Sequence, residues 1–330
     1  MPIAADTRVD ELDGLRAIAV LLVFLSHAFP ETFPGGFIGV DLFFALSGYL
    51  ITGILLREWD RFGSISLTKF YARRALRIMP ALLTLLAAYA ALALLVSAHP
   101  SEHLKAIASA GLYVMNWTWG LHLGPVGHVS HTWSLAIEEQ FYLLWPAVLI
   151  AMCTYTDRRR LTGLIGGVIG IVFVWRLALV LGSADVDRIY GGFDTRLDAL
   201  FVGCLLAAIR PAHPTRLISG EAWLAPATLL AVFTFTTEYD ARWYQLGGMS
   251  GIAVCSAWLL ACILHSHDSL LTRGLRWGPL VALGRISYGF YLWHWPIISV
   301  LSEAGYSQWT IFVIALPLTL VMASLSYVAT

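Results

Sequence analysis

The sequence predicts an all-α integral membrane protein, a bundle of about ten transmembrane helices. Hydrophobic residues make up 58% of the chain and charged residues only 13%, whereas soluble domains carry about 25% charged residues. A membrane-spanning helix needs about 20 mostly apolar residues, so 330 residues leave little room for a soluble domain. The net charge is zero, which gives no basic field for nucleic acid.

Ten apolar stretches are long enough to be predicted spans. They cover residues 14–30, 37–56, 79–98, 134–156, 161–182, 193–209, 222–237, 244–264, 280–303 and 309–330. A weaker segment, 104–120, contains Lys105, Asn116, two tryptophans and two glycines. We predict that this segment is re-entrant or lies in the outer membrane interface.

The turns between these stretches differ strongly in charge. One side carries 14 Lys and Arg residues and the other side carries three. Cytoplasmic loops are enriched in Lys and Arg, so the basic side is predicted to be cytoplasmic. Both termini then face the cytoplasm, and residues 104–120 cannot cross. The 14 residues are Arg8, Arg57, Arg61, Lys69, Arg73, Arg74, Arg77, Arg158, Arg159, Arg160, Arg210, Arg216, Arg273 and Arg276.

Two ionisable residues lie within the first predicted span, Arg16 and His27. Ionisable groups inside a bilayer are costly and are functional candidates by default. The two are 11 residues apart, which in a helix is three turns plus about 20°, with a rise of roughly 16 Å. They therefore share one helix face, with Arg16 near the cytoplasmic end and His27 near the outer end. A packed structural histidine is the alternative.

The span at 134–156 starts on the outer side and carries Glu138 about one turn below its start. Glu138 is thus predicted at the depth of His27, where a carboxylate would orient an imidazole as a general base. Ser134 shares the face of Glu138 because the two are four residues apart. Glu139 is better explained as an acidic residue at a helix start, where the helix dipole favours it.

A cytoplasmic cluster contains Arg74 and Arg77, which are three residues apart. Two guanidinium groups can hold a phosphate bidentately. The positive-inside rule explains the same residues without a ligand, so this cluster alone does not decide between the two.

Six motifs in order resemble the acyltransferase-3 family and cover nearly the whole chain. The similarity is greatest to the branch that O-acetylates O-antigen and related cell-surface glycans. The motifs are Arg16-x10-His27; Gly39-Val40-Asp41 through Gly48-Tyr49-Leu50-Ile51; Arg74-x-x-Arg77-Ile78-x-Pro80; Trp133-Ser134-Leu135-x-x-Glu138-x-Gln140-Phe141-Tyr142-x-x-Trp145-Pro146; Arg196-x-Asp198-x4-Gly203; and Ile286-Ser287-Tyr288-Gly289-x-Tyr291-Leu292-x-His294-x-Pro296.

The resemblance implies transfer of an acyl group, most often acetyl, from cytoplasmic acyl-CoA to a hydroxyl of an extracytoplasmic glycan or lipid-linked glycan. It implies His27 as the general base assisted by Glu138, and Arg16, Arg74 and Arg77 as donor-binding residues. It also implies a multi-pass protein of the bacterial cytoplasmic (inner) membrane, in contact with the lipid bilayer, with acetyl-CoA as substrate and no tightly bound cofactor. Supporting or acceptor-side roles are implied for Asp41, Ser134, Arg196, Asp198, Tyr288 and His294.

The sequence is also compatible with two other classes of protein. Buried charges in a helical bundle also suit a proton-coupled transporter of a small metabolite or polysaccharide precursor, and an inactive glycan-binding protein is a third class.

His122, His128 and His131 are interpreted as solvated loop residues, and no metal site is expected. We predict one transmembrane acyltransferase domain over 1–330. Because Thr330 precedes the Glu-x-Pro-type end usual in the family, truncation at the C-terminus stays open.

Overall fold

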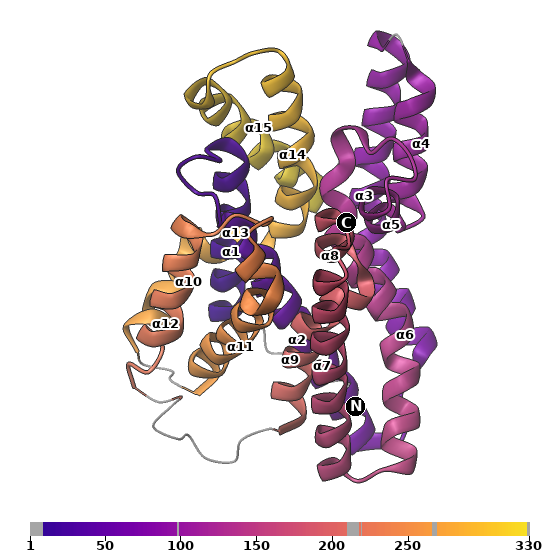
Figure 1. Ribbon diagram of the computed structural model, residues 1–330, viewed down its shortest axis with the longest axis vertical. Helices are drawn as coiled ribbons and strands as arrows, with labels where there is room; N and C mark the ends of the chain where they lie inside the picture. Colours follow the sequence, from indigo (N-terminus) through magenta and orange to yellow (C-terminus); the bar gives the residue numbers. More distant parts are fainter. Residues whose placement is uncertain (1–8, 98, 210–217, 219, 266–268, 329–330) are drawn as a thin grey trace.

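The computed structural model describes residues 9–97, 99–209, 218, 220–265 and 269–328, and within them the regular elements are helices (Figure 1). This confirms the predicted all-α class. The longer helices are α1 (Asp10–Ala28), α2 (Gly39–Phe62), α3 (Leu67–Val96), α4 (Pro100–Gly111), α6 (Trp133–Tyr155), α7 (Arg158–Leu181), α9 (Phe193–Ile209), α10 (Leu224–Thr236), α11 (Met249–His265), α14 (Ser287–Glu303) and α15 (Gln308–Val328). The shorter ones are η1 (Gly36–Ile38), α5 (Met115–Gly120), η2 (Gly127–Thr132), α8 (Val186–Gly191), η3 (Tyr244–Gly248), α12 (Leu270–Leu275) and α13 (Gly278–Arg285).

Six helices among the described residues are long and apolar enough to cross a membrane, so the predicted count of ten is not confirmed. The six are Gly36–Phe62, Leu67–Leu95, Gly127–Tyr155, Arg158–Leu181, Tyr244–His265 and Gln308–Val328. Two other predicted spans are short, because α9 has 17 residues and α10 has 13. At 1.5 Å per residue these reach about 26 and 20 Å, less than a hydrocarbon core of about 30 Å.

The predicted span at 280–303 is divided in two. Helix α13 ends at Arg285 and α14 begins at Ser287, with Ile286 between them at φ −98° and ψ 6°. The weak segment 104–120 is likewise divided into α4 and α5, of 12 and 6 residues. Neither is long enough to cross a membrane alone, as expected for a segment that does not span.

The turns predicted to lie on opposite sides are at opposite ends of the bundle. The α6–α7 turn lies at the lower end in Figure 1, whereas α4 and the α14–α15 turn lie at the upper end. Arg158 at the start of α7 pairs with Asp60 near the end of α2 at 3.0 Å, so two of the basic turns meet. Three residues of the predicted basic side, Arg8, Arg210 and Arg216, lie outside the described residues.

Helices α2 and α9 pack closely because glycines face the neighbouring backbone. A Cβ atom added at Gly48 would lie 1.9 Å from the carbonyl oxygen of Leu200, and one at Gly203 would lie 2.0 Å from that of Ala45. Only a residue without a side chain permits this approach. The glycine of the motif that begins at Arg196 thus has a packing role, and it brings the charged residues of α9 next to α2.

Candidate functional site

A cavity of about 730 Å³ lies among α1, α2, α3, α6 and α14. Such a volume is typical of sites for small molecules and cofactors. Its polar lining gathers residues from distant parts of the chain: Asp13, Arg16, Ser47, Tyr49, Arg57, Arg74, Arg77, Ser134, Glu138, Tyr142, Ser287, Tyr288 and Tyr291. The three arginines expected to bind a donor, together with Ser134, Glu138 and Tyr288, therefore share one cavity.

Two of these arginines are held by neighbouring groups. The Nη1 atom of Arg16 lies 3.1 Å from Oδ1 of Asp13, one turn away on α1. Arg74 lies over the ring of Tyr142, 3.2 Å from its centroid, and its Nε is 3.6 Å from Oε1 of Glu139. Cation–π contact and ion pairing both restrict a guanidinium group. Arg74 is thus oriented from α6 before any ligand arrives.

Glu138 contacts Ser47 and not His27. The hydroxyl of Ser47 donates to Oε1 of Glu138 at 2.6 Å, across α2 and α6. The described residues contain no hydrogen bond between Glu138 and His27, so the direct contact predicted from their similar depth is wrong. Depth along a helix says nothing about which way each helix is rotated, and α6 turns Glu138 toward α2.

His27 pairs instead with His294 of α14. Their Nδ1 and Nε2 atoms are 3.0 Å apart, and the two ring planes lie within 8° of each other. The indole of Trp295 packs against His27 with 4.4 Å between ring centroids. From the sequence, His294 was predicted to have only a supporting or acceptor-side role, so its contact with His27 comes from the tertiary structure.

Tyr291 contacts both the cavity and this histidine pair. It lines the cavity, and its ring centroid is 5.2 Å from that of His294. The Tyr291 hydroxyl donates to the backbone carbonyl of His131 at 2.8 Å and lies 2.6 Å from Oγ of Ser134. Ser134 therefore acts in the structure as a partner of Tyr291, the cavity residue that contacts His294.

The remaining motif residues form a buried ionic network outside the cavity lining. Arg196 of α9 pairs with Asp41 of α2 at 2.9 Å, and Asp198 of α9 pairs with Arg176 of α7 at 2.8 Å. Ser250 of α11 donates to Asp198 at 2.5 Å. All four charged residues are at most 2% exposed. The network joins α2, α7, α9 and α11, which gives Asp41, Arg196 and Asp198 an architectural role.

We expect Asp41→Asn to lower stability strongly, because it leaves the Arg196 guanidinium buried without its counter-ion. Removing one partner of a buried pair typically costs about 3–5 kcal/mol. Asp60→Asn is a matched control, since the Asp60–Arg158 pair has a similar distance of 3.0 Å but is 44% and 37% exposed and should contribute about 0–1 kcal/mol. Thermal unfolding of both variants in detergent measures the difference. Equal losses would contradict a structural role for the buried pair.

Several site residues were not predicted as such. Glu139 was explained as a helix-start residue, but it pairs with Arg74. Arg57 was counted only as a topology signal, and it lines the cavity. His131 was interpreted as a solvated loop residue, but it is 4% exposed, which corrects that prediction. For Glu139 the available signal was its place beside Glu138, inside the Trp133–Pro146 segment, although the motif leaves this position unspecified. No local pattern marks the other two.

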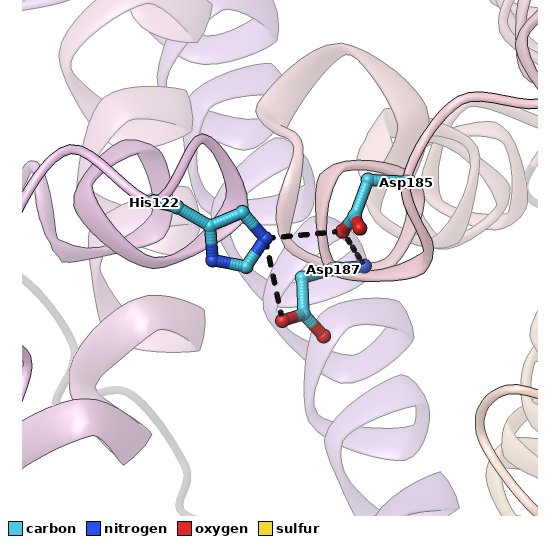
Figure 2. Close-up of side chains that lie close together, drawn as sticks. All are labelled: His122, Asp185 and Asp187. Atoms are coloured by element: carbon cyan, nitrogen blue, oxygen red, sulfur yellow. Dashed lines mark hydrogen bonds and ion pairs between the residues drawn. The ribbon is translucent and has the colours of Figure 1, made fainter.

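His122 forms an exposed cluster with Asp185 and Asp187 (Figure 2). Its Nε2 atom is 3.4 Å from Asp185 and 3.9 Å from Asp187. Partial burial and the neighbouring Asp185 raise the pKa of Asp187, and His122 opposes this shift. Asp185 also caps α8 by accepting from the Asp187 backbone N–H at 2.8 Å. The cluster thus ties the 121–126 loop to the start of α8.

Comparisons with known proteins agree with the motif pattern. Residues 9–328 match the family model described as an acyltransferase domain, acyltransferase-3. A Bacillus subtilis protein named "Putative peptidoglycan O-acetyltransferase YrhL" is 36% identical over 96% of this chain and 53% of its own length. The peptidoglycan O-acetyltransferase OatA of Listeria monocytogenes is 36% identical over 88% of this chain and 50% of its own length. No solved structure matches.

The chain spans about half the length of these curated relatives. The family model, in contrast, covers almost every described residue, and it does so over helices of which six are long and apolar enough to span a membrane. The chain is a multi-pass membrane protein that belongs to the acyltransferase-3 family.

Proposed function

We propose that this protein transfers an acetyl group from acetyl-CoA to a hydroxyl of an extracytoplasmic glycan. The observation that carries the proposal is the cavity, in which Arg16, Arg74 and Arg77 share one lining with Tyr291, the residue that contacts the His27–His294 pair. A basic region for phosphates and a candidate base are thus joined by one cavity and one aromatic side chain.

The donor would bind with its phosphates on the arginine side. Coenzyme A carries several phosphate charges, and Arg74 is already oriented by Tyr142 and Glu139. A preorganised guanidinium group loses less side-chain entropy on binding. We place Arg57 in the same donor region, because it lines this cavity and the adjoining one. Glu138 is part of the cavity wall, where it accepts a hydrogen bond from the Ser47 hydroxyl.

The reaction would take place on the Tyr291 side of the cavity. His27 removes the proton from the acceptor hydroxyl, and the hydroxyl oxygen attacks the thioester carbonyl. The carbon–sulfur bond then breaks, and the coenzyme A thiolate leaves and takes up the proton from His27. Direct transfer needs no covalent acyl-enzyme, and a base positioned in this way typically contributes about 10²- to 10⁴-fold.

The acceptor proposed is a cell-envelope glycan, either polymeric or lipid-linked. Support comes from the names of two relatives, which specify peptidoglycan O-acetylation. The protein would lie in a bacterial inner membrane, with the basic turns and both termini in the cytoplasm.

Purified protein in lipid nanodiscs, supplied with radiolabelled acetyl-CoA and soluble peptidoglycan fragments, tests this function. We expect label to appear in the glycan as an ester and coenzyme A to be released with it. A transporter of the kind considered above would release no coenzyme A. If neither acetyl-CoA turnover nor glycan labelling occurs with any envelope glycan tried, the proposed activity is wrong.

The proposed orientation predicts which positions are accessible from outside the cell. In a background with the four native cysteines replaced, His122→Cys should react with an impermeant thiol reagent, and Arg159→Cys should react only after the membrane is opened. Both side chains are exposed, so reactivity reports sidedness. The opposite labelling pattern would place the arginine side of the cavity outside, where acyl-CoA is absent, and would contradict the proposal.

A further inference from the structure

The hydrogen bonds around His294 determine which of its ring nitrogens carries a proton. Its Nδ1 atom lies 2.5 Å from the backbone carbonyl oxygen of Tyr291, one turn earlier in α14. A carbonyl oxygen can only accept, so Nδ1 must be the protonated nitrogen. In neutral His294 the Nε2 atom then carries a lone pair, and that lone pair faces Nδ1 of His27 at 3.0 Å.

The proton position on His294 in turn determines the proton position on His27. Because Nε2 of His294 accepts, Nδ1 of His27 must donate. A neutral imidazole has one protonated nitrogen, so Nε2 of His27 is left with the lone pair. The two rings are within 8° of parallel with 5.2 Å between centroids, an arrangement that allows a nearly in-plane N–H···N bond. His27 is half-buried, whereas His294 is fully buried.

Packing fixes His294 in place. It is 0% exposed, and its ring lies 5.4 Å from His131 at 84° and 6.5 Å from Phe24. His131 has its own backbone partner, since its Nε2 is 3.1 Å from the carbonyl oxygen of Leu292. His131 therefore packs edge-on against His294, and its Nε2 hydrogen bond goes to Leu292 and not to His27.

We infer that His294 is the positioning residue for His27: it selects the Nδ1–H tautomer and leaves Nε2 of His27 as the base. This inference rests on the proposed function, because it names the atom that would take the acceptor proton. A neutral imidazole is suited to the role in this apolar part of the bundle, where a carboxylate would carry a large desolvation cost. When His27 becomes protonated, its Nδ1–H bond to His294 becomes charge-assisted and stronger.

Nitrogen-15 NMR of histidine-labelled full-length protein in nanodiscs tests the pairing directly. Spectra are recorded at about pH 8, where an ordinary imidazole is neutral, and the His27 signals are assigned by difference with His27→Gln. We expect His27 in the Nδ1–H form. In His294→Leu, which removes the acceptor, this preference should be lost. In His294→Gln, whose amide oxygen can accept near the Nε2 position, it should be kept.

His131→Gln is the matched control. Its amide N–H can still donate to Leu292, so the His27 tautomer should stay that of the unmodified protein. His294→Leu should lower kcat about 10- to 100-fold, the loss seen when the hydrogen-bond partner of a metal-bound histidine is removed, and leave KM for acetyl-CoA unchanged. His294→Gln should restore a large part of kcat.

The outcomes separate this inference from the proposed function. An Nε2–H tautomer of His27 in the unmodified protein overturns the inference even if His294→Leu does not fold. Equal effects of His131→Gln and His294→Leu on the His27 tautomer also overturn the inference, because they would indicate a packing effect alone. If no acetyl transfer is found but the tautomer depends on His294, the proposed function fails and the pairing stands. If transfer occurs and the tautomer ignores His294, only the inference fails.

Discussion

His27→Ala should abolish acetyl transfer and leave the folded protein in the membrane. His27 is half-buried at the end of α1, so loss of its ring removes a modest amount of packing, whereas loss of a general base lowers kcat about 100- to 10,000-fold. Transfer of radiolabelled acetyl groups to glycan measures the effect. Size-exclusion chromatography and thermal unfolding in detergent check that the variant is folded.

His99→Ala is a suitable control for this prediction, because His99 is exposed just before α4 and lies outside the cavity lining. It should show unchanged transfer. Product yield close to that of the unmodified protein from well-folded His27→Ala would remove His27 as the base. The role of His294 inferred above would then lose its catalytic meaning, although the contact between the two rings would remain.

Arg77→Ala should raise KM for acetyl-CoA and leave KM for the glycan nearly unchanged. Arg77 lines the cavity together with Arg16 and Arg74, and a hydrogen bond to a charged group contributes about 1.5–3 kcal/mol. This corresponds to a roughly ten- to a hundred-fold loss of donor affinity. Arg77→Lys should recover only part of it, because lysine keeps the charge and loses the planar fork. Steady-state kinetics with each substrate varied in turn measures both constants.

Arg73→Ala provides the matched control for this prediction. Arg73 belongs to the same basic turn of α3 and is exposed, but it does not line the cavity. If the cluster acts only through membrane orientation, Arg73→Ala and Arg77→Ala should have equal effects. If Arg77 binds the donor, only its variant should change KM for acetyl-CoA. An increase in glycan KM for Arg77→Ala would contradict the division between donor and acceptor ends.

Local sequence determined the class of the protein and much of its cavity. Apolar composition and run length decide whether a segment can leave water, and this property belongs to each segment by itself. The shared face of Arg16 and His27 also follows from helical periodicity, and both lie in the single uninterrupted helix α1. Arg74 and Arg77 line the cavity because both lie in the early turns of α3, which form part of its wall.

Helix boundaries were less accessible to sequence reasoning. The interruption at Ile286 and the short lengths of α9 and α10 cannot be recognised from the average hydropathy of a segment. Once a helix is enclosed by others, its ends are decided by packing and by backbone hydrogen bonds. A buried short helix and a spanning helix can therefore have the same composition.

The sequence by itself determined an all-helical membrane protein of the acyltransferase-3 type, with His27 and the arginines as candidates. Only the tertiary structure decided which side chains meet: Ser47 contacts Glu138 across 91 positions, and His294 contacts His27 across 267. The physical reason is rotation about the helix axis. Periodicity places residues on a face of their own helix, but the packing of all the other helices decides what that face touches, so the partner of the proposed base could not be predicted from either segment alone.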